Sequence, residues 1–229
     1  MSLPTTATEV SATLEQQVYE SLRADLMAGR FLPGEKLSLR KVAFANGVSP
    51  MPAREAFKRL LSEGALQLLP NRTIAVPKLF IEDFRHLMDV RAMIEGYAAE
   101  LAVDAISSRG IAGLARKNSL LLQAFAEADL DRAMRLNMEF HLDLYAFSNS
   151  VVLTPMIQGL WMRMGPIIRA GMDQKTVEWS ASEHKVALSA LELRDRKGVR
   201  RAIERDIRGT VAAFEKTGVF TSRRHDQLL

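Results

Sequence analysis

The chain has 229 residues, of which 48% are hydrophobic and 25% charged, so it can bury a core of ordinary size in one or two globular domains. It contains no cysteine, which excludes disulfide scaffolds, thiolate metal sites and cysteine nucleophiles and leaves only nitrogen and oxygen atoms as metal ligands. The formal net charge of +4 is compatible with a nucleic-acid partner. No apolar run approaches the ~18 residues of a membrane span and no secretion signal is visible, so we expect a cytoplasmic protein without a membrane partner.

The first third of the sequence is divided by glycine and proline into short segments, which predicts small packed elements. Ser38 and Ser49 can each cap a following helix, and the second of these helices begins with proline at its first position. The predicted elements are helices over 13–28, 39–47 and 50–64 and strands over 65–69 and 73–76. Three helices followed by a two-stranded wing form the plan of a winged helix-turn-helix.

In this plan the third helix enters the major groove of DNA, while the wing tip reaches the adjacent minor groove. The start of the second helix lies beside the phosphate backbone. The candidate DNA-binding residues are therefore Arg40, Ser49, Met51, Arg54, Lys58, Asn71 and Arg72. The alternative interpretation is that these are ordinary solvated side chains. Their placement on three separate contact surfaces of one module favours DNA binding.

From Phe80 onward the apolar residues recur at helical spacing. The predicted helices cover 81–107, 110–127, 130–148, 151–171, 175–194 and 197–216. The Gly165-Pro166 pair is expected to end or kink the fourth of them. We therefore predict a mainly α-helical fold, with a winged helix-turn-helix in residues 1–77 and an all-α bundle of about six helices in residues 78–229.

Four polar residues interrupt apolar helical faces in this second part. Asn137 and His141 are four residues apart and share one face. If the last two helices form a hairpin that turns near residue 195, His184 and Asp206 lie at the same height, eleven residues before and after the turn. Unpaired polar groups in a bundle interior cost roughly 2–7 kcal/mol, so the four must be satisfied by hydrogen bonds within the core, by ordered water, by a ligand or by a metal ion. They suit a divalent ion such as Zn, Mn, Ni or Mg, or else a metal-free pocket that holds a ligand directly.

Two stretches of the sequence resemble known families. The run LPGEKLSLRKVAFANGVSPMPAREAFKRLLSEGAL resembles the N-terminal signature of the GntR family of bacterial transcription regulators, and the match covers about residues 13–77. This resemblance implies binding to operator DNA, with Arg40 and Arg54 on family positions that contact it. The helical part resembles the FCD-type ligand-binding domain of the FadR subfamily, on residues 90–102, 137–149 and 183–191 and on the 22-residue spacing from His184 to Asp206.

The second resemblance implies a metal site and an effector site. That family often binds a divalent metal through an aspartate four residues before a first histidine and through two further histidines. Here His141 and His184 match, Asn137 replaces the aspartate, and Asp206 replaces the last histidine. We expect these four residues to be the metal ligands, with Zn, Mn or Ni as the ion.

Three further residues are candidates for binding the effector. Arg91 can clamp a carboxylate, although Glu95 lies four residues on and a salt bridge between the two is the favoured alternative. Arg163 precedes the expected helix break, and Asn149 ends one of the family-like stretches.

Together these interpretations predict a bacterial transcription regulator, a metabolite-responsive repressor that binds a near-palindromic operator in double-stranded DNA as a homodimer. A small carboxylate effector would be sensed in the helical domain. The alternatives are a metal-dependent enzyme of an all-α bundle that acts on a small carboxylate metabolite, and a DNA-binding dimer whose helical domain only dimerises. The sequence shows no nucleophile and base pair and no phosphate-binding glycine loop, which disfavours an enzyme.

Overall fold

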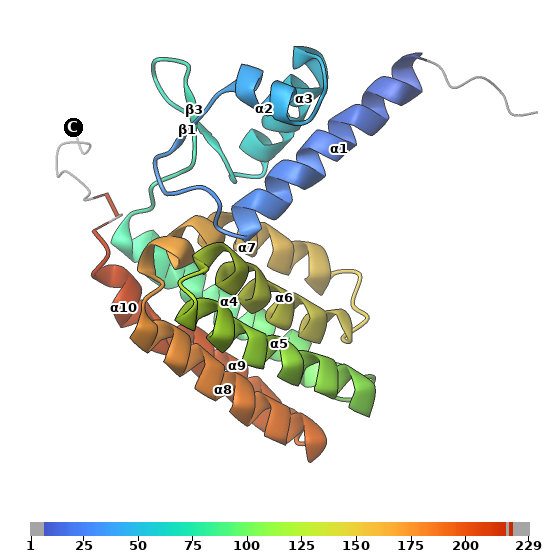
Figure 1. The fold of residues 1–229 in the computed structure, drawn as a ribbon, viewed down its shortest axis with the longest axis vertical. Helices are drawn as coiled ribbons and strands as arrows, with labels where there is room; N and C mark the ends of the chain where they lie inside the picture. The colour runs from blue at the N-terminus through green and yellow to red at the C-terminus, as the bar shows by residue number, and fades with distance from the viewer. Residues whose placement is uncertain (1–6, 219, 222–229) are drawn as a thin grey trace, which may run out of the picture.

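A winged-helix unit lies at one end of a larger helical bundle in the computed structural model, which describes residues 7–218, 220 and 221 (Figure 1). The long first helix runs from the winged-helix unit down to the bundle. The predicted fold class is confirmed, because the described chain is mainly helical and its strands are confined to the winged-helix unit. None of the described helices is both long and apolar enough to span a bilayer.

The N-terminal unit is built around two helices that cross. It contains α1 (Ala7–Met27), β1 (Lys36–Leu37), α2 (Leu39–Ala45), α3 (Pro50–Ser62), β2 (Gln67–Leu68) and β3 (Ile74–Ala75). Leu22 and Leu26 of α1 and Phe57 of α3 are buried in the shared core. Ser38 caps α2 as predicted, by accepting a hydrogen bond from the Lys41 amide at 3.4 Å. Ser49 occupies the N-cap position of α3, but its side chain makes no capping hydrogen bond.

The wing is part of a three-stranded sheet in which β3 lies between β1 and β2 and is antiparallel to both. The sequence predicted the hairpin of β2 and β3 but missed β1. Two residues are too few to show the alternation of apolar and polar side chains that marks a strand. β1 forms because the edge of β3 that β2 leaves uncovered can pair with it. Two backbone hydrogen bonds continue this pairing, from Gly34 N to Val76 O at 3.0 Å and from Val76 N to Glu35 O at 2.9 Å.

The bundle contains Trp161, the largest fully buried side chain, and also buries Phe140. Its helices are α4 (Ile81–Ala102), α5 (Ser108–Ala126), α6 (Leu130–Ala146), α7 (Leu153–Gly171), α8 (Gln174–Glu192), α9 (Arg196–Gly209) and α10 (Val211–Glu215). α4 and α8 both pack along α9, and α5 packs against α6 and α8. Asp129 and Asp195 cap α6 and α9 through their side chains. These contacts place the middles of α6, α8 and α9 around one interior point.

Several helix ends differ from prediction, and α1 begins at Ala7 rather than at residue 13. α7 covers nearly the predicted 151–171, and Gly165-Pro166 does not end it, because tertiary packing buries nearly every residue around this pair and holds the helix together. The helix expected over 197–216 is broken at Thr210, whose hydroxyl bonds to the carbonyl of Ile207 at 2.9 Å. The helix expected over 81–107 ends earlier, because the following residues turn toward the cap of α5.

Candidate functional sites

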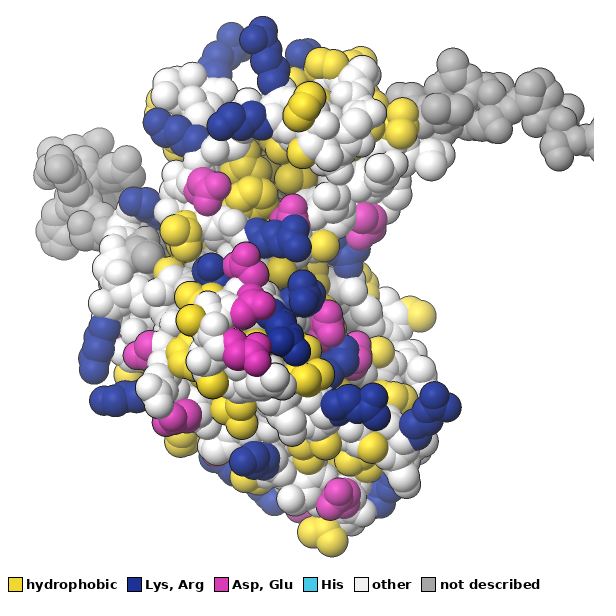
Figure 2. All heavy atoms as spheres, in the orientation of Figure 1, with side chains coloured by type: hydrophobic (Ala, Val, Ile, Leu, Met, Phe, Trp, Pro, Cys, Tyr) yellow, Lys and Arg dark blue, Asp and Glu magenta, His cyan; other side chains and the backbone are white. Residues whose placement is uncertain are grey.

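The candidate DNA-binding residues all lie exposed on the winged-helix unit. The inner face of α3 is buried through Ala53 and Phe57, so Arg54 and Lys58 point outward, four residues apart. Lys58 is paired with Glu55 at 2.7 Å. Figure 2 shows lysine and arginine side chains gathered at the end of the molecule that the winged-helix unit forms.

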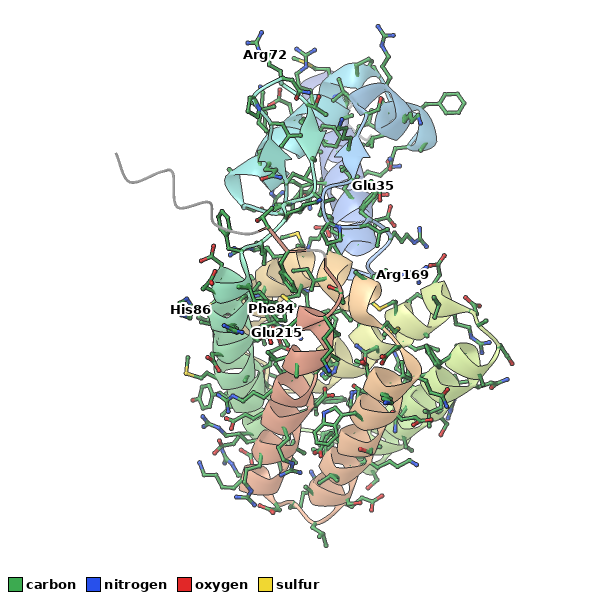
Figure 3. The ribbon with its side chains drawn as sticks, turned by 90° about the vertical axis from the view of Figure 1, so that its left-hand side faces the viewer. Glu35, Arg72, Phe84, His86, Arg169 and Glu215 are labelled. Atoms are coloured by element: carbon green, nitrogen blue, oxygen red, sulfur yellow. The ribbon has the colours of Figure 1, made fainter. Side chains whose placement is uncertain are left out.

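Arg40 lies on α2, Ser49 precedes α3 and Met51, which is 60% exposed, lies in its first turn. Asn71 and Arg72 form the tip of the wing, and Figure 3 shows Arg72 directed away from the body of the protein. Arg72 has a φ of 61°, in the left-handed region that costs a non-glycine residue roughly 1–2 kcal/mol. This conformation is held by a hydrogen bond from its amide to Leu69 O at 2.8 Å. The backbone of the wing tip is thus held in one conformation, from which the Arg72 guanidinium extends outward (Figure 3).

Inside the bundle, three predicted metal ligands meet. His141 from α6, His184 from α8 and Asp206 from α9 are each less than 5% exposed. The two Nε2 atoms are 3.1 Å apart, and the Asp206 carboxylate lies 3.1 Å from Nε2 of His141 and 3.6 Å from Nε2 of His184. Within the described residues these three are the group of side chains whose ligand atoms can hold a metal ion together.

The other ring nitrogen of each histidine is held by a partner that fixes the tautomer. Asn118 donates its amide to the Ala181 carbonyl at 3.0 Å, so its own oxygen faces Nδ1 of His184 at 3.0 Å and accepts a proton from it. Tyr145 donates its hydroxyl to Glu95 at 2.9 Å, so its oxygen accepts from Nδ1 of His141, also at 2.9 Å. In both rings the proton therefore lies on Nδ1, and Nε2 carries a lone pair.

Two lone pairs and a carboxylate oxygen thus converge in a buried space. The two lone pairs and the carboxylate oxygen repel one another unless a cation, either a proton or a metal ion, lies among the three atoms. Ligand atoms about 2.1 Å from a metal lie roughly 3.0–3.4 Å from one another at octahedral or tetrahedral angles, close to the spacings found here. The residues present therefore fit a divalent ion that accepts two imidazoles and a carboxylate.

The acid and base properties of the site agree with this assignment. Burial lowers the pKa of His184 below its usual value, which favours the neutral ring that a metal requires. Burial raises the pKa of Asp206, but protons shared with His141 and His184 lower it by more, so this pKa lies below its usual range and a positive charge among the three groups favours the carboxylate. Burial and the neighbouring Glu95 raise the pKa of Tyr145 well above its ordinary value, so the phenol keeps its proton.

Asn137 lies at the edge of this centre. It is buried, lines the cavity beside the centre, and its side-chain oxygen accepts a hydrogen bond from Ser180 at 3.4 Å. The Ser180 hydroxyl is also 3.2 Å from Nε2 of His184. Asn137 is thus connected to the histidines through Ser180, a residue that the sequence analysis did not single out.

A cavity of about 30 Å³ is lined by two of these ligands, His141 and Asp206, and by Arg91, Trp161 and Thr210 among others. Since one water needs roughly 10–15 Å³ of such space, the cavity has room for two or three groups of that size. The salt bridge weighed for Arg91 is present, with Nε donating to Glu95 at 2.6 Å. Arg91 also faces the cavity, with its guanidinium 4.8 Å from the centre of the Trp161 ring. Arg91 is therefore paired with Glu95 and also lines the cavity.

The other two effector candidates lie elsewhere. Arg163 is exposed on the outer side of α7, and Asn149 is exposed in the turn after α6, so the cavity is lined by neither. Arg163 was placed near the pocket because Gly165-Pro166 was expected to end or kink α7 beside it, but its side chain lies on the exposed face of the helix. Besides Ser180, the residues that the sequence did not indicate are Tyr145, Asn118 and Trp161. Of these, only Tyr145 gave a signal, because it follows His141 by four residues on the same helical face.

Comparison with known proteins matches both parts of this structure. The family of bacterial regulatory proteins named gntR matches residues 14–76, and the FCD domain family matches residues 86–209. The chain belongs to the GntR family of regulators that carry an FCD domain. This GntR regulator is 28% identical over 213 residues to the HTH-type transcriptional regulator McbR of Escherichia coli K12, covering 92% of this chain and 96% of McbR.

Other relatives agree with this assignment. The HTH-type transcriptional repressor RspR of E. coli K12 is 28% identical over 202 residues, or 87% of this chain and 89% of RspR. The solved structure of E. coli McbR/YncC superposes with a TM-score of 0.80 at 29% identity, over 88% of this chain and 97% of that one. A GntR regulator from Rhodococcus sp. RHA1 shares the fold, with a TM-score of 0.73 at 19% identity over 89% and 98% of the two chains. The protein is therefore a DNA-binding transcription regulator rather than an enzyme.

The buried pair of Arg91 and Glu95 gives a test of the site. Replacing Glu95 with alanine leaves the Arg91 charge and the donors of Tyr145 and Trp161 buried without their acceptor. We expect Glu95→Ala to lower the free energy of unfolding by about 3–5 kcal/mol in urea denaturation followed by circular dichroism. Glu82→Ala, at an exposed position of the same helix, should change it by less than about 0.5 kcal/mol. A loss below about 1 kcal/mol for Glu95→Ala would contradict this account.

Proposed function

We propose that this GntR regulator is a metabolite-responsive repressor that binds a near-palindromic operator as a homodimer. Residues 1–77 would bind DNA, and residues 78–229 would bind the effector and the second subunit. One recognition helix covers only a few base pairs, so two-fold symmetry doubles the number of specific contacts. The name of RspR as a repressor supports the direction of regulation.

Exposed cations on three surfaces of the winged-helix unit support the assignment of DNA binding to these residues. Arg54 on α3 has the length and the guanidinium fork needed to reach a guanine edge, while Ser49 and Met51 lie beside it at the start of the same helix. Arg40 on α2 and Arg72 on the wing lie on either side, where phosphates and the minor groove would be.

Removing Arg54 tests this interface. We expect Arg54→Ala to weaken binding to a DNA duplex enriched by in vitro selection by roughly 10- to 100-fold, corresponding to ~1–3 kcal/mol, because one base contact is lost. Fluorescence anisotropy measures the affinity, and the same titration should give two chains per duplex. Arg109→Ala, at an exposed arginine of α5, serves as the control and should bind as the wild type does. Unchanged binding by Arg54→Ala would mean that bases are read elsewhere.

The convergence of two Nε2 lone pairs on a buried carboxylate is the observation that carries the proposal of a sensor. We propose that His141, His184 and Asp206, with Asn137 at the edge, hold Zn, Mn or Ni. A bound ion would supply the positive charge that this set lacks and would attract a carboxylate. Arg91 faces the same cavity and would bind the other side of that carboxylate. The volume of about 30 Å³ suits a small carboxylate group rather than a large ring system.

The histidines give a direct test of sensing. We expect His141→Ala and His184→Ala each to lose Zn²⁺ binding in calorimetry and to lose any change in DNA affinity on adding Zn²⁺, while DNA binding itself persists. Coupling of this kind usually amounts to ~1–3 kcal/mol. His86→Ala is the matched control, since His86 is exposed on the outer face of α4 (Figure 3). If both site variants still respond as the wild type does, these residues have only a structural role.

A further inference from the structure

The hydrogen-bond partners behind the two histidines have a role beyond filling space. We propose that Tyr145, backed by Glu95, and Asn118 are positioning residues that hold both imidazoles with their Nε2 lone pairs facing Asp206. This inference rests on the proposed metal site, and it concerns residues that are not themselves ligands. Tyr145 and Asn118 are 2% and 3% exposed, so no bulk water can replace them.

Glu95 determines the direction of the hydrogen bonds at His141. Its carboxylate is fully buried and accepts from Arg91 Nε at 2.6 Å, Tyr145 at 2.9 Å and Trp161 Nε1 at 3.1 Å. A carboxylate with these donors can only accept, so the Tyr145 proton points to Glu95 and the phenol oxygen must accept from His141. Without the phenol, Nδ1 of His141 would lose its acceptor, and the ring could carry its proton on Nε2, directed at the other ligands.

The two rings are held independently of each other. Nδ1 of His184 faces the Asn118 oxygen on α5, and its ring stacks on Phe140 at 3.8 Å. Nδ1 of His141 faces Tyr145 on its own helix. Either partner can therefore be removed while the other ring stays in place, which allows the role of each to be measured separately.

Tyr145→Phe is the deciding variant, with Tyr97→Phe, at an exposed tyrosine of α4, as the matched control. In metal-free protein at pH 8, ¹⁵N NMR of the imidazoles should show Nδ1 protonated in both His141 and His184 of the wild type, with any further proton shared between the Nε2 atoms and Asp206. Tyr145→Phe should shift His141 toward a mixture and leave His184 unchanged. Zn²⁺ affinity should fall by about 10- to 100-fold in Tyr145→Phe and stay within about two-fold in Tyr97→Phe.

Other outcomes separate this proposal from the proposed function. The wild type could show the expected tautomers and still not bind Zn²⁺. That result would overturn the metal site, and with it the proposed role of Tyr145 and Asn118 toward a metal. Wild-type Nε2–H tautomers, or equal Zn²⁺ affinity in the two variants, would overturn the positioning role alone. If Tyr145→Phe does not fold, Asn118→Ala applies the same two measurements to His184.

A different observation concerns how α1 meets α7. The end of α1 lies directly on α7 where the N-terminal unit joins the bundle (Figure 1). A β-carbon on Gly165 would lie 2.1 Å from the carbonyl oxygen of Leu26 and 2.7 Å from that of Met27, so only glycine permits this approach. Gly29 faces the same place, and a β-carbon there would lie 2.7 Å from Gly165 O and 2.9 Å from Met134 Cε.

The same segment of α7 lines the cavity. Trp161, one turn before Gly165, and Ile168, about one turn after it, are both cavity residues. Met134, which touches Gly29, lies one turn before Asn137 on α6. We infer that backbone contact at Gly165 transmits a displacement of α7 to α1 and so to the DNA-binding surface. This second inference also rests on the proposed function.

Gly165→Ala tests the contact, and Gly159→Ala on the same helix is the control, since no atom lies within 4 Å of the added methyl group there. Both variants should bind Zn²⁺ within about two-fold of the wild type. Only Gly165→Ala should lose most of the change in DNA affinity that Zn²⁺ causes. An unchanged response in Gly165→Ala would overturn the inference, and a wild type without any response would overturn both it and metal sensing.

A second measurement covers the case that Gly165→Ala does not fold. Arg23 of α1 and Gln158 of α7 are hydrogen-bonded across the contact, and the chain has no cysteine of its own. Arg23→Cys with Gln158→Cys can therefore be joined by a short bis-maleimide. The linked protein should bind DNA without responding to Zn²⁺, whereas the same protein capped with N-ethylmaleimide should respond. A full response in the linked protein would contradict the inference.

Discussion

Burial of the Glu95 carboxylate is the constraint around which the helical bundle is arranged. A carboxylate that is fully buried is tolerated only if several donors and a positive charge reach it. Here those donors come from three helices: Arg91 on α4, Tyr145 on α6 and Trp161 on α7. The register of α4 against α6 and α7 is therefore fixed by hydrogen bonds as well as by apolar packing, and any ligand that moves one of these side chains disturbs the other two.

Charge balance relates the proposed metal site to the neighbouring ion pair of Arg91 and Glu95. Arg91 and Glu95 cancel, so with neutral imidazoles the buried groups described here sum to the single negative charge of Asp206. A divalent ion with one carboxylate of the effector would bring that sum to zero. The exchange of residues relative to the family pattern, with Asn137 in place of an aspartate and Asp206 in place of a histidine, keeps one carboxylate and hence keeps this balance.

The winged-helix unit and the helical bundle differ in the physical properties on which their roles depend. The winged-helix unit exposes cations on a small frame, and its buried apolar residues hold α3 and the wing in place. The bundle also buries polar residues, and those around Glu95 and His184 are hydrogen-bonded to one another. Contact between the units includes a close approach of backbone at Gly165 and Gly29, beside the side-chain hydrogen bond from Arg23 to Gln158. Backbone contacts have little freedom to absorb a displacement, so a shift of α7 would be passed on to α1.

The sequence by itself determined the winged helix-turn-helix, the bundle and the set of His141, His184 and Asp206, because helical periodicity and caps are local and show which polar residues lie on apolar faces. It could not determine β1, since two residues carry no pattern, or decide whether Gly165-Pro166 ends α7, since packing there overrides the local preference. Nor could it place Arg163 and Asn149, which face outward, or find Asn118 and Trp161. These last two contribute through hydrogen bonds to residues more than 60 positions away, and only the tertiary structure decides which distant donors and acceptors meet.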